Sequence, residues 1–438
     1  MEDNKSSERI GLALSGGGYR AAAYHLGTFK KLKELGLLNK IDVFSSNSGG
    51  SITTACYALH HEDFNMFEKT VLDGLKESVV LRALLSWRFW IPAVLIFSIL
   101  VLGILLLFTY LSWVGITLLA IVLLLMLIAQ FSLFPTSYVI EGVYDDIFYH
   151  GKKLGDFSEL FEVAILSTNL STGRPFTFSR GKMTDSSYEY PKTGSNISFN
   201  GRDFPVARAV MASTCVPGVF SPVRIHKRYF AKVGDAKRVN PCLVDGGVYD
   251  NQGIHKVTFR DSSFFCHNVI VSDAGTMMPE ESSFQNSLSL LIRTSAVLMN
   301  RVKNFQMQRS LFEVPNENKS VVAYQSLGFD VHKSIQEFLN MLKAGYISDK
   351  VMAAHRINQL DVDEENWESI RGMLEERIDY QSILRKSCSN LELEIARSIR
   401  TNLTPLSETE INVLIKHAMN MTEIQVKLFC PHILDDRL

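Results

Sequence analysis

The sequence predicts an α/β protein, because two strand–turn–helix units follow one another near its N-terminus. The first runs from the apolar segment 10–14 through three glycines into an Ala-rich helix that ends before Gly36. The second runs from an apolar segment at 43–45 through a turn of small residues into a helix over 51–59. Parallel strands bring such turns to one edge of a sheet, which is where open α/β folds bind their ligands.

Length and charge limit the classes of function. The chain has 438 residues, enough for two or three average domains or for one large α/β domain with insertions. Its formal net charge is −1 and its pI is about 6.8, so it has no global basic field that would concentrate nucleic acid. We therefore expect no nucleic-acid partner.

Cysteine usage and the N-terminus indicate a cytosolic catalytic part. The six cysteines are scattered, without a C-x-x-C pair or zinc-like Cys/His spacing, and are expected to be reduced thiols. Residues 1–9 are polar and lack the apolar region of a signal peptide. No metal or other cofactor is expected.

The glycine loop Ser15-Gly16-Gly17-Gly18-Tyr19-Arg20 precedes the first helix. Backbone N–H groups at a helix N-terminus attract anions, so this loop predicts an oxyanion or phosphate site. A dinucleotide-binding loop is the competing reading, since G-x-G-x-x-A also fits. However, Asp42 precedes the next strand, whereas the ribose-binding acid belongs at the end of that strand. The absence of Gly-Lys-Ser/Thr after the loop argues against a P-loop.

Ser48 is the candidate nucleophile. It lies in Ser46-Asn47-Ser48-Gly49-Gly50, close to the G-x-S-x-G turn that exposes a serine hydroxyl between a strand and a helix. An ordinary flexible Ser/Gly turn is the alternative. Ser46 stands where the first glycine of that motif would stand, and its side chain is expected to strain the turn.

An apolar segment over residues 89–134 interrupts the globular pattern. No charged residue occurs between Arg88 and Glu141, and about 45 apolar residues suffice for two membrane crossings. The segment divides at 109–115, where Tyr110 and Trp113 would act as interfacial anchors. Basic residues on both flanks place both ends in the cytosol. A pair of buried helices is the alternative.

Asp245 is the candidate base. It is expected to end a strand at 242–245, with Gly246-Gly247 as a tight turn into a further strand. Such an acid often only forms the turn, but a carboxylate at a strand end can also accept the proton of Ser48. Asp273 is expected to be a strand-end residue rather than a second base, and Arg208 a structural ion-pair residue.

The C-terminal third is expected to be mainly helical. A helix over 284–312 is predicted to pack on the sheet through Leu291, Leu298, Val302 and Phe305, with a binding groove as the lesser alternative. Arg301, Lys303 and Arg309 are expected on its solvated face. Ser407-Glu-Thr-Glu410 is a capping box that opens the last helix.

Together the glycine loop, the Ser48 turn, Ala207-Arg208-Ala209 through Ala212-Ser213 to Pro217, and Asp245-Gly246-Gly247 resemble the patatin-like phospholipase family. The resemblance covers about residues 8–80 and 136–276, and the segment 406–414 is similar to the final helix of some members. It implies a three-layer α/β/α fold and a Ser–Asp dyad of Ser48 and Asp245. Gly16, Gly17 and Gly18 then form the oxyanion hole, with Arg20, Gly50, Gly246 and Gly247 in support.

The expected protein is a membrane-anchored serine acyl hydrolase of the phospholipase A/lysophospholipase type. It is expected to act on phospholipid in a bilayer, with its catalytic domain on the cytosolic side. The expected parts are 1–80 and 141–276 for the catalytic domain, 81–140 for the transmembrane hairpin and 277–438 for a helical extension. Two alternatives stay open: a Ser–His–Asp triad that uses His255 or His267, and an inactive membrane scaffold that binds lipid or a partner.

Overall fold

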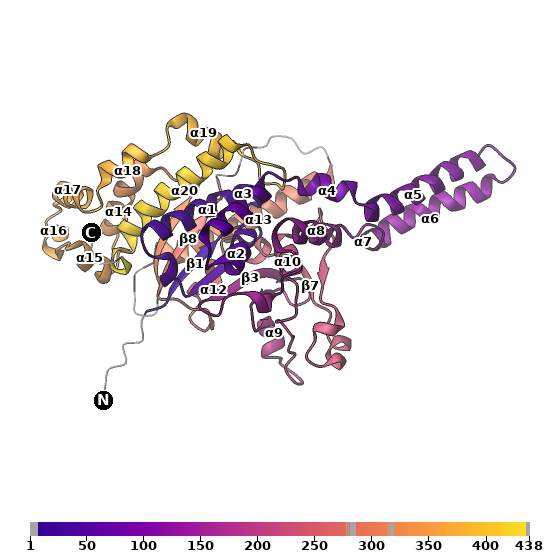
Figure 1. Cartoon of the computed structure of the whole chain (residues 1–438), viewed down its shortest axis with the longest axis horizontal. Helices are drawn as coiled ribbons and strands as arrows, with labels where there is room; N and C mark the ends of the chain where they lie inside the picture. Colours follow the sequence, from indigo (N-terminus) through magenta and orange to yellow (C-terminus); the bar gives the residue numbers. More distant parts are fainter. Residues whose placement is uncertain are drawn as a thin grey trace.

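A mixed β-sheet forms the centre of the molecule (Figure 1). The computed structural model describes residues 8–276, 278, 280, 286–313, 315 and 319–434. Along its main path the sheet has the order β5-β4-β3-β2-β1-β8-β9, and β7 pairs with both β3 and β6. The strands are β1 (Ile10–Leu14), β2 (Val43–Asn47), β3 (Glu162–Asn169), β4 (Arg174–Phe178), β5 (Met183–Thr184), β6 (Val223–Arg224), β7 (Cys242–Asp245), β8 (Asn268–Asp273) and β9 (Val321–Ser326).

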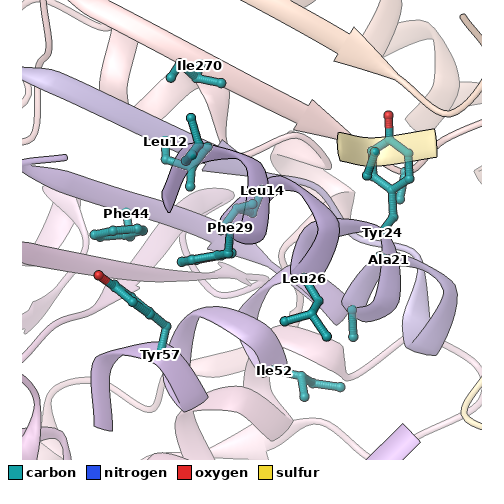
Figure 2. Packing of buried hydrophobic residues seen from close by; sticks show 14 of the residues in the cluster. Leu12, Leu14, Ala21, Tyr24, Leu26, Phe29, Phe44, Ile52, Tyr57 and Ile270 are labelled. Carbon is teal, nitrogen blue, oxygen red and sulfur yellow. The ribbon is translucent and has the colours of Figure 1, made fainter. Parts of the chain in front are cut away.

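One face of the sheet is covered by α1 (Gly18–Glu34), α2 (Gly49–His60) and α20 (Glu408–Phe429). Successive side chains of β1 point to opposite faces of the sheet, so Leu12 and Leu14 pack against this helical layer while Ala13 packs on the opposite face. Phe29 of α1 stacks on Phe44 of β2 at a centroid distance of 5.7 Å (Figure 2). The predicted α/β class and the capping box at Ser407 are both confirmed.

The opposite face is covered by α12 (Ile254–Thr258) and part of α13 (Ser287–Leu311). The molecule therefore has three layers, α/β/α, as the resemblance implied. The C-terminal region is not a separate layer, because β9 extends the sheet and α20 lies along α1 (Figure 1). The expected division at residue 277 stays a prediction.

The remaining helices connect or flank these layers. Between α2 and β8 in the chain, and apart from the apolar insertion and α12, the helices are α3 (Phe64–Leu75), α4 (Val79–Leu85), α8 (Thr136–Tyr144), α9 (Ser186–Glu189), α10 (Val206–Thr214) and α11 (Gly247–Asp250). The C-terminal helices are α14 (Ser334–Lys343), α15 (Asp349–His355), α16 (Gln359–Asp363), α17 (Trp367–Arg377), α18 (Tyr380–Lys386) and α19 (Asn390–Ser398).

The apolar insertion forms a helical hairpin that projects away from the globular body (Figure 1). It consists of α5 (Trp87–Leu106) and α6 (Ser112–Ile128), followed by the short α7 (Gln130–Leu133). Gly103 and Gly115 let the two helices approach closely, because a Cβ on Gly115 would lie 2.6 Å from the Gly103 carbonyl oxygen. Most of the large side chains of the hairpin are exposed, so its helices are not the buried pair of the alternative reading.

Only α5, with 20 residues, is by itself long and apolar enough to cross a membrane within the described residues. A second span is obtained only if Ser112–Ile128 and Gln130–Tyr149, which are bent by 88° at their junction, count as one.

Three expectations about local structure are wrong. The residues after Gly246 form the helix α11 rather than a strand. The predicted apolar face of α13 does not pack on the sheet, since Leu298 and Phe305 are 59% and 65% exposed; α13 contacts the sheet's core through Met307 and Leu311 instead. Lys303 is not solvated, because its ammonium group pairs with the buried carboxylate of Asp273 at 2.7 Å. Phe284, the expected start of α13, lies outside the described residues.

Candidate active site

Two strands that run toward each other bring Ser48 and Asp245 together. β2 is parallel to β3 and pairs as far as Asn47 with Leu166, whereas β7 is antiparallel and pairs as far as Asp245 with Ser167. β4 pairs with residues 165–169 of β3, and these residues also pair with β2 or β7, so β2 and β7 both lie on the side of β3 opposite to β4. The C-terminal ends of β2 and β7 therefore meet at one point. Ser48 directly follows β2, and Asp245 is the last residue of β7.

Ser48 occupies a strained turn between β2 and α2. Its backbone angles are φ 46° and ψ −120°, in the positive-φ region that non-glycine residues rarely adopt. Such a conformation costs on the order of 1–3 kcal/mol and is typical of functional sites. The side chain is nearly buried at the N-terminus of α2. The turn thus has the geometry of a nucleophile elbow.

The strain expected at Ser46 is absent. Ser46 is the fourth residue of β2, and it is not among the residues with positive φ. Its hydroxyl is fully buried and accepts a hydrogen bond from the Ser51 hydroxyl at 3.2 Å. The serine is accommodated by a polar partner, and the backbone strain lies at Ser48.

Asp245 is a buried carboxylate with a raised pKa. Burial raises the pKa of its carboxyl group from 3.8 to about 6, against the opposing effects of hydrogen bonds from the Gly247 N–H and the Ser48 side chain. The Gly247 N–H donates to Oδ1 of Asp245 at 2.7 Å. A carboxylate with this pKa is ionised at neutral pH yet accepts a proton more readily than an exposed aspartate.

The glycine loop lies against the Ser48 turn, but its three N–H groups are not equivalent. A Cβ on Gly16 would lie 3.1 Å from the Ser48 Cβ. The Gly16 N–H donates to the Asn251 carbonyl oxygen at 2.8 Å, so it is not free to bind an oxyanion. In the described part of the chain, no hydrogen bond occupies the N–H groups of Gly17 and Gly18. Of the three predicted donors, the N–H groups of Gly17 and Gly18 are therefore the ones that remain candidates for an oxyanion hole.

The supporting glycines are required by close backbone contacts. A Cβ on Gly50 would lie 2.7 Å from the Leu14 carbonyl oxygen, and one on Gly246 would overlap the Asn47 side chain. Asn47 in turn donates from Nδ2 to the Asp250 carbonyl oxygen. The elbow, the glycine loop and the turn after Asp245 are thus packed against one another.

A family comparison decides the relationship of this site to known proteins. The family described as patatin-like phospholipase matches residues 12–257, which is more than half of the chain and includes every predicted site residue. The chain belongs to the patatin-like phospholipase family. It is accordingly a lipid acyl hydrolase by family, which the sequence motifs predicted.

Comparisons with individual proteins give weaker likenesses. VipD from Legionella pneumophila has a TM-score of 0.33 at 13% identity, with 95% of this chain and 91% of VipD covered. Human GIVD cytosolic phospholipase A2 has a TM-score of 0.47 at 11% identity, with 98% of this chain and 62% of that chain covered. The same human enzyme with a methyl gamma-linolenyl fluorophosphonate inhibitor has a TM-score of 0.42 at 12% identity, with 98% and 59% covered. None of the curated proteins matches the chain significantly.

The histidines of the alternative triad do not join this patatin-like site. The His255 ring stacks on Phe259, and the His267 ring contacts Phe265. Neither makes a hydrogen bond to Ser48 or Asp245 among the described residues. Asp273 is also excluded as a second base, because its carboxylate is held by Lys303 and by the Tyr324 hydroxyl at 2.6 Å. Arg208 forms the expected ion pair, with Glu141 at 2.7 Å.

The C-terminal region reaches the glycine loop, which the sequence did not suggest. Arg20, expected only to end that loop, is buried and donates to the Ile399 carbonyl oxygen at 2.9 Å. The Tyr19 N–H donates to the Asn402 carbonyl oxygen at 2.9 Å. His25 also contacts the loop, since its Nε2 lies 2.9 Å from the Ser15 carbonyl oxygen. Burial lowers the pKa of His25 to about 4. The glycine loop is thus held by residues 399 and 402 of the C-terminal region and by His25 of α1.

A largely apolar groove lies beside helix α11, which follows Asp245 in the chain; neither Ser48 nor Asp245 lines it. It has a volume of about 1130 Å³ and lies between α13 and the helices α11 and α12. Val248 and Tyr249, which follow the Asp245 turn directly, line it together with Leu298, Val302 and Phe305. The exposed apolar face of α13 is thus one wall of the groove.

Proposed function

We propose that the protein is a membrane-anchored serine acyl hydrolase that cleaves phospholipid acyl esters with a Ser48–Asp245 dyad. The observation that carries this proposal is the meeting of β2 and β7 beside β3. It brings a strained serine turn to a buried carboxylate whose pKa is raised to about 6.

In the proposed mechanism, Asp245 accepts the Ser48 hydroxyl proton as Ser48 Oγ attacks the acyl carbon of the ester. The N–H groups of Gly17 and Gly18 stabilise the oxyanion that forms on the former carbonyl oxygen. When the C–O bond to the leaving lysolipid breaks, Asp245 returns the proton to the alkoxide. Water then attacks the acyl-Ser48 ester with Asp245 again as base, which releases the fatty acid and restores Ser48.

We assign the groove beside α11 to the acyl chain. A phospholipid must place its ester at Ser48 while its hydrocarbon chain stays out of water, and this groove provides apolar walls from Val248 onward. In this assignment the exposed apolar residues of α13 contact the acyl chain.

The hairpin is proposed as the anchor, with both of its ends on the cytosolic side. An even number of crossings leaves the glycine loop and Asp245, which flank the insertion in sequence, in the same compartment. To test this, single cysteines are introduced at Arg88, Tyr110 and Lys152 and labelled with an impermeant reagent in sealed vesicles. Positions 88 and 152 should react from the same side and position 110 from the other. Labelling of 88 and 152 from opposite sides would contradict the hairpin topology.

The function is tested by incubating purified protein with mixed phospholipids and measuring free fatty acid and lysolipid. The wild type should release both in equal amounts, and Ser48→Ala should release neither. If the wild type binds phospholipid but releases no product, the protein is the inactive scaffold of the alternative reading.

A further inference from the structure

We propose that Ser213 is a positioning residue that holds both Ser48 and the Asp245 turn in their reactive geometry. Ser213 is the eighth residue of α10 and is fully buried. Its hydroxyl oxygen accepts the Ser48 N–H at 2.9 Å, and its carbonyl oxygen accepts the Gly246 N–H at 3.2 Å. One residue therefore contacts the backbone on both sides of the proposed dyad. This inference rests on the proposed function.

The Ser213 hydroxyl is the centre of a chain of buried serines. Ser51 donates its only hydroxyl proton to Ser46, so the 2.9 Å contact between Ser51 and Ser213 requires Ser213 to donate. The Ser213 hydroxyl then accepts from Ser48 N–H and donates to Ser51. Successive hydrogen bonds of this kind polarise one another and fix the orientation of each hydroxyl.

This arrangement explains how a non-glycine residue keeps φ 46° at Ser48. A strained conformation persists only where the surroundings determine it. The Ser48 N–H is directed toward Ser213, which orients the peptide plane before Ser48 and so directs the Ser48 side chain.

The segment that carries Ser213 is held at its other end as well. The Asp245 N–H donates to the Cys215 carbonyl oxygen at 2.8 Å. Further along, the Ser221 N–H donates to Thr136 Oγ1 at 2.9 Å, and the Ser137 hydroxyl donates to the Ser221 carbonyl oxygen. Thr136 and Ser137 begin α8 directly after the hairpin. The segment from Ser213 to Ser221 is thus fixed between the dyad and the base of the hairpin.

Ser213→Ala tests the inference, with Ser167→Ala as the matched control. Ser167 is also a buried serine in this region. Its hydroxyl donates to the Val244 carbonyl oxygen at 2.7 Å, with the Ala212 carbonyl oxygen 3.1 Å away, and within the described residues it makes no hydrogen bond with Ser48. Both variants lose one buried hydroxyl. We expect kcat for phospholipid hydrolysis to fall about 10- to 100-fold in Ser213→Ala with KM nearly unchanged, as for a misplaced reacting group. Ser213→Thr, which retains the hydroxyl, should recover most of kcat.

A second measurement does not depend on activity. Hydrogen exchange of the peptide that contains Ser48 should be faster in Ser213→Ala than in Ser167→Ala at equal thermal stability. Equal exchange and equal kcat in the two variants would overturn the positioning role. Absence of hydrolysis by the wild type would instead refute the proposed function, and faster exchange in Ser213→Ala would still support the structural link to Ser48.

Discussion

Replacement of Asp245 by asparagine should abolish turnover and at the same time stabilise the protein at neutral pH. Asp245 is only 4% exposed, and burial raises its pKa from 3.8 to about 6. A raised pKa means that the folded protein prefers the protonated carboxyl group. The contribution of Asp245 to the free energy of unfolding is greatest below pH 3.8 and is lost as the pH rises through about 6. Above that pH the ionised form costs about 3 kcal/mol, from a shift of about 2 pKa units.

Asparagine removes the charge, and its Oδ1 can still accept the Gly247 N–H. The gain in free energy of unfolding should therefore approach about 3 kcal/mol at pH 8 and vanish near pH 4. Thermal unfolding of the detergent-solubilised wild type and variant across this pH range measures the effect.

Asp250→Asn is the informative comparison. Burial also raises the pKa of Asp250 to about 6, but its two oxygens accept three backbone N–H groups, from Gln252, Gly253 and His255. In Asp250→Asn the amide NH₂ group would face one of these N–H donors and could not accept a hydrogen bond from it. The free energy of unfolding should therefore rise less in this variant than in Asp245→Asn, or fall. If Asp245→Asn is destabilised at pH 8, or if its gain grows toward pH 4, the account of Asp245 is refuted.

Three other predictions concern the site. The value of kcat/KM on a neutral ester should rise about tenfold per pH unit below pH 6 and level off above it, because ionised Asp245 is the base; a rate independent of pH between 5 and 8 would count against this. Leu298→Trp should lower kcat/KM for long-chain esters about tenfold relative to short-chain esters by filling the groove, whereas Leu291→Trp, on the same helix but outside the groove, should not. Ser46→Gly should lower the free energy of unfolding by about 1 kcal/mol, measured by denaturation, because it removes the hydrogen bond from Ser51 and relieves no strain.

Local patterns predicted much of the fold. β1, β2 and the helix after the glycine loop follow from apolar runs that end in glycine or small polar residues. The order of the four motifs identified the family, since each short motif alone fits several turns.

The spatial arrangement of strands that are far apart in the chain could not be predicted from the sequence. Nothing in residues 43–47 or 242–245 indicates that β2 and β7 share one side of β3, because that depends on register and strand direction. The hydrogen bond from the Gly16 N–H to the Asn251 carbonyl oxygen, which occupies one of the predicted oxyanion donors, depends on the same packing. The predicted packing of helix α13 was wrong for a different reason. Its apolar spacing is typical of a core helix, and periodicity does not reveal whether the apolar face meets the sheet or borders a groove.

The central claim is that Ser48 is a nucleophile activated by Asp245, and covalent labelling tests it most directly. The protein is treated with a fluorophosphonate that carries a long alkyl chain, and the modified residue is located by mass spectrometry. We predict a single adduct on Ser48, absent in Ser48→Ala and formed much more slowly in Asp245→Asn. An adduct that persists in Ser48→Ala, or forms in Asp245→Asn at the wild-type rate, would contradict the dyad.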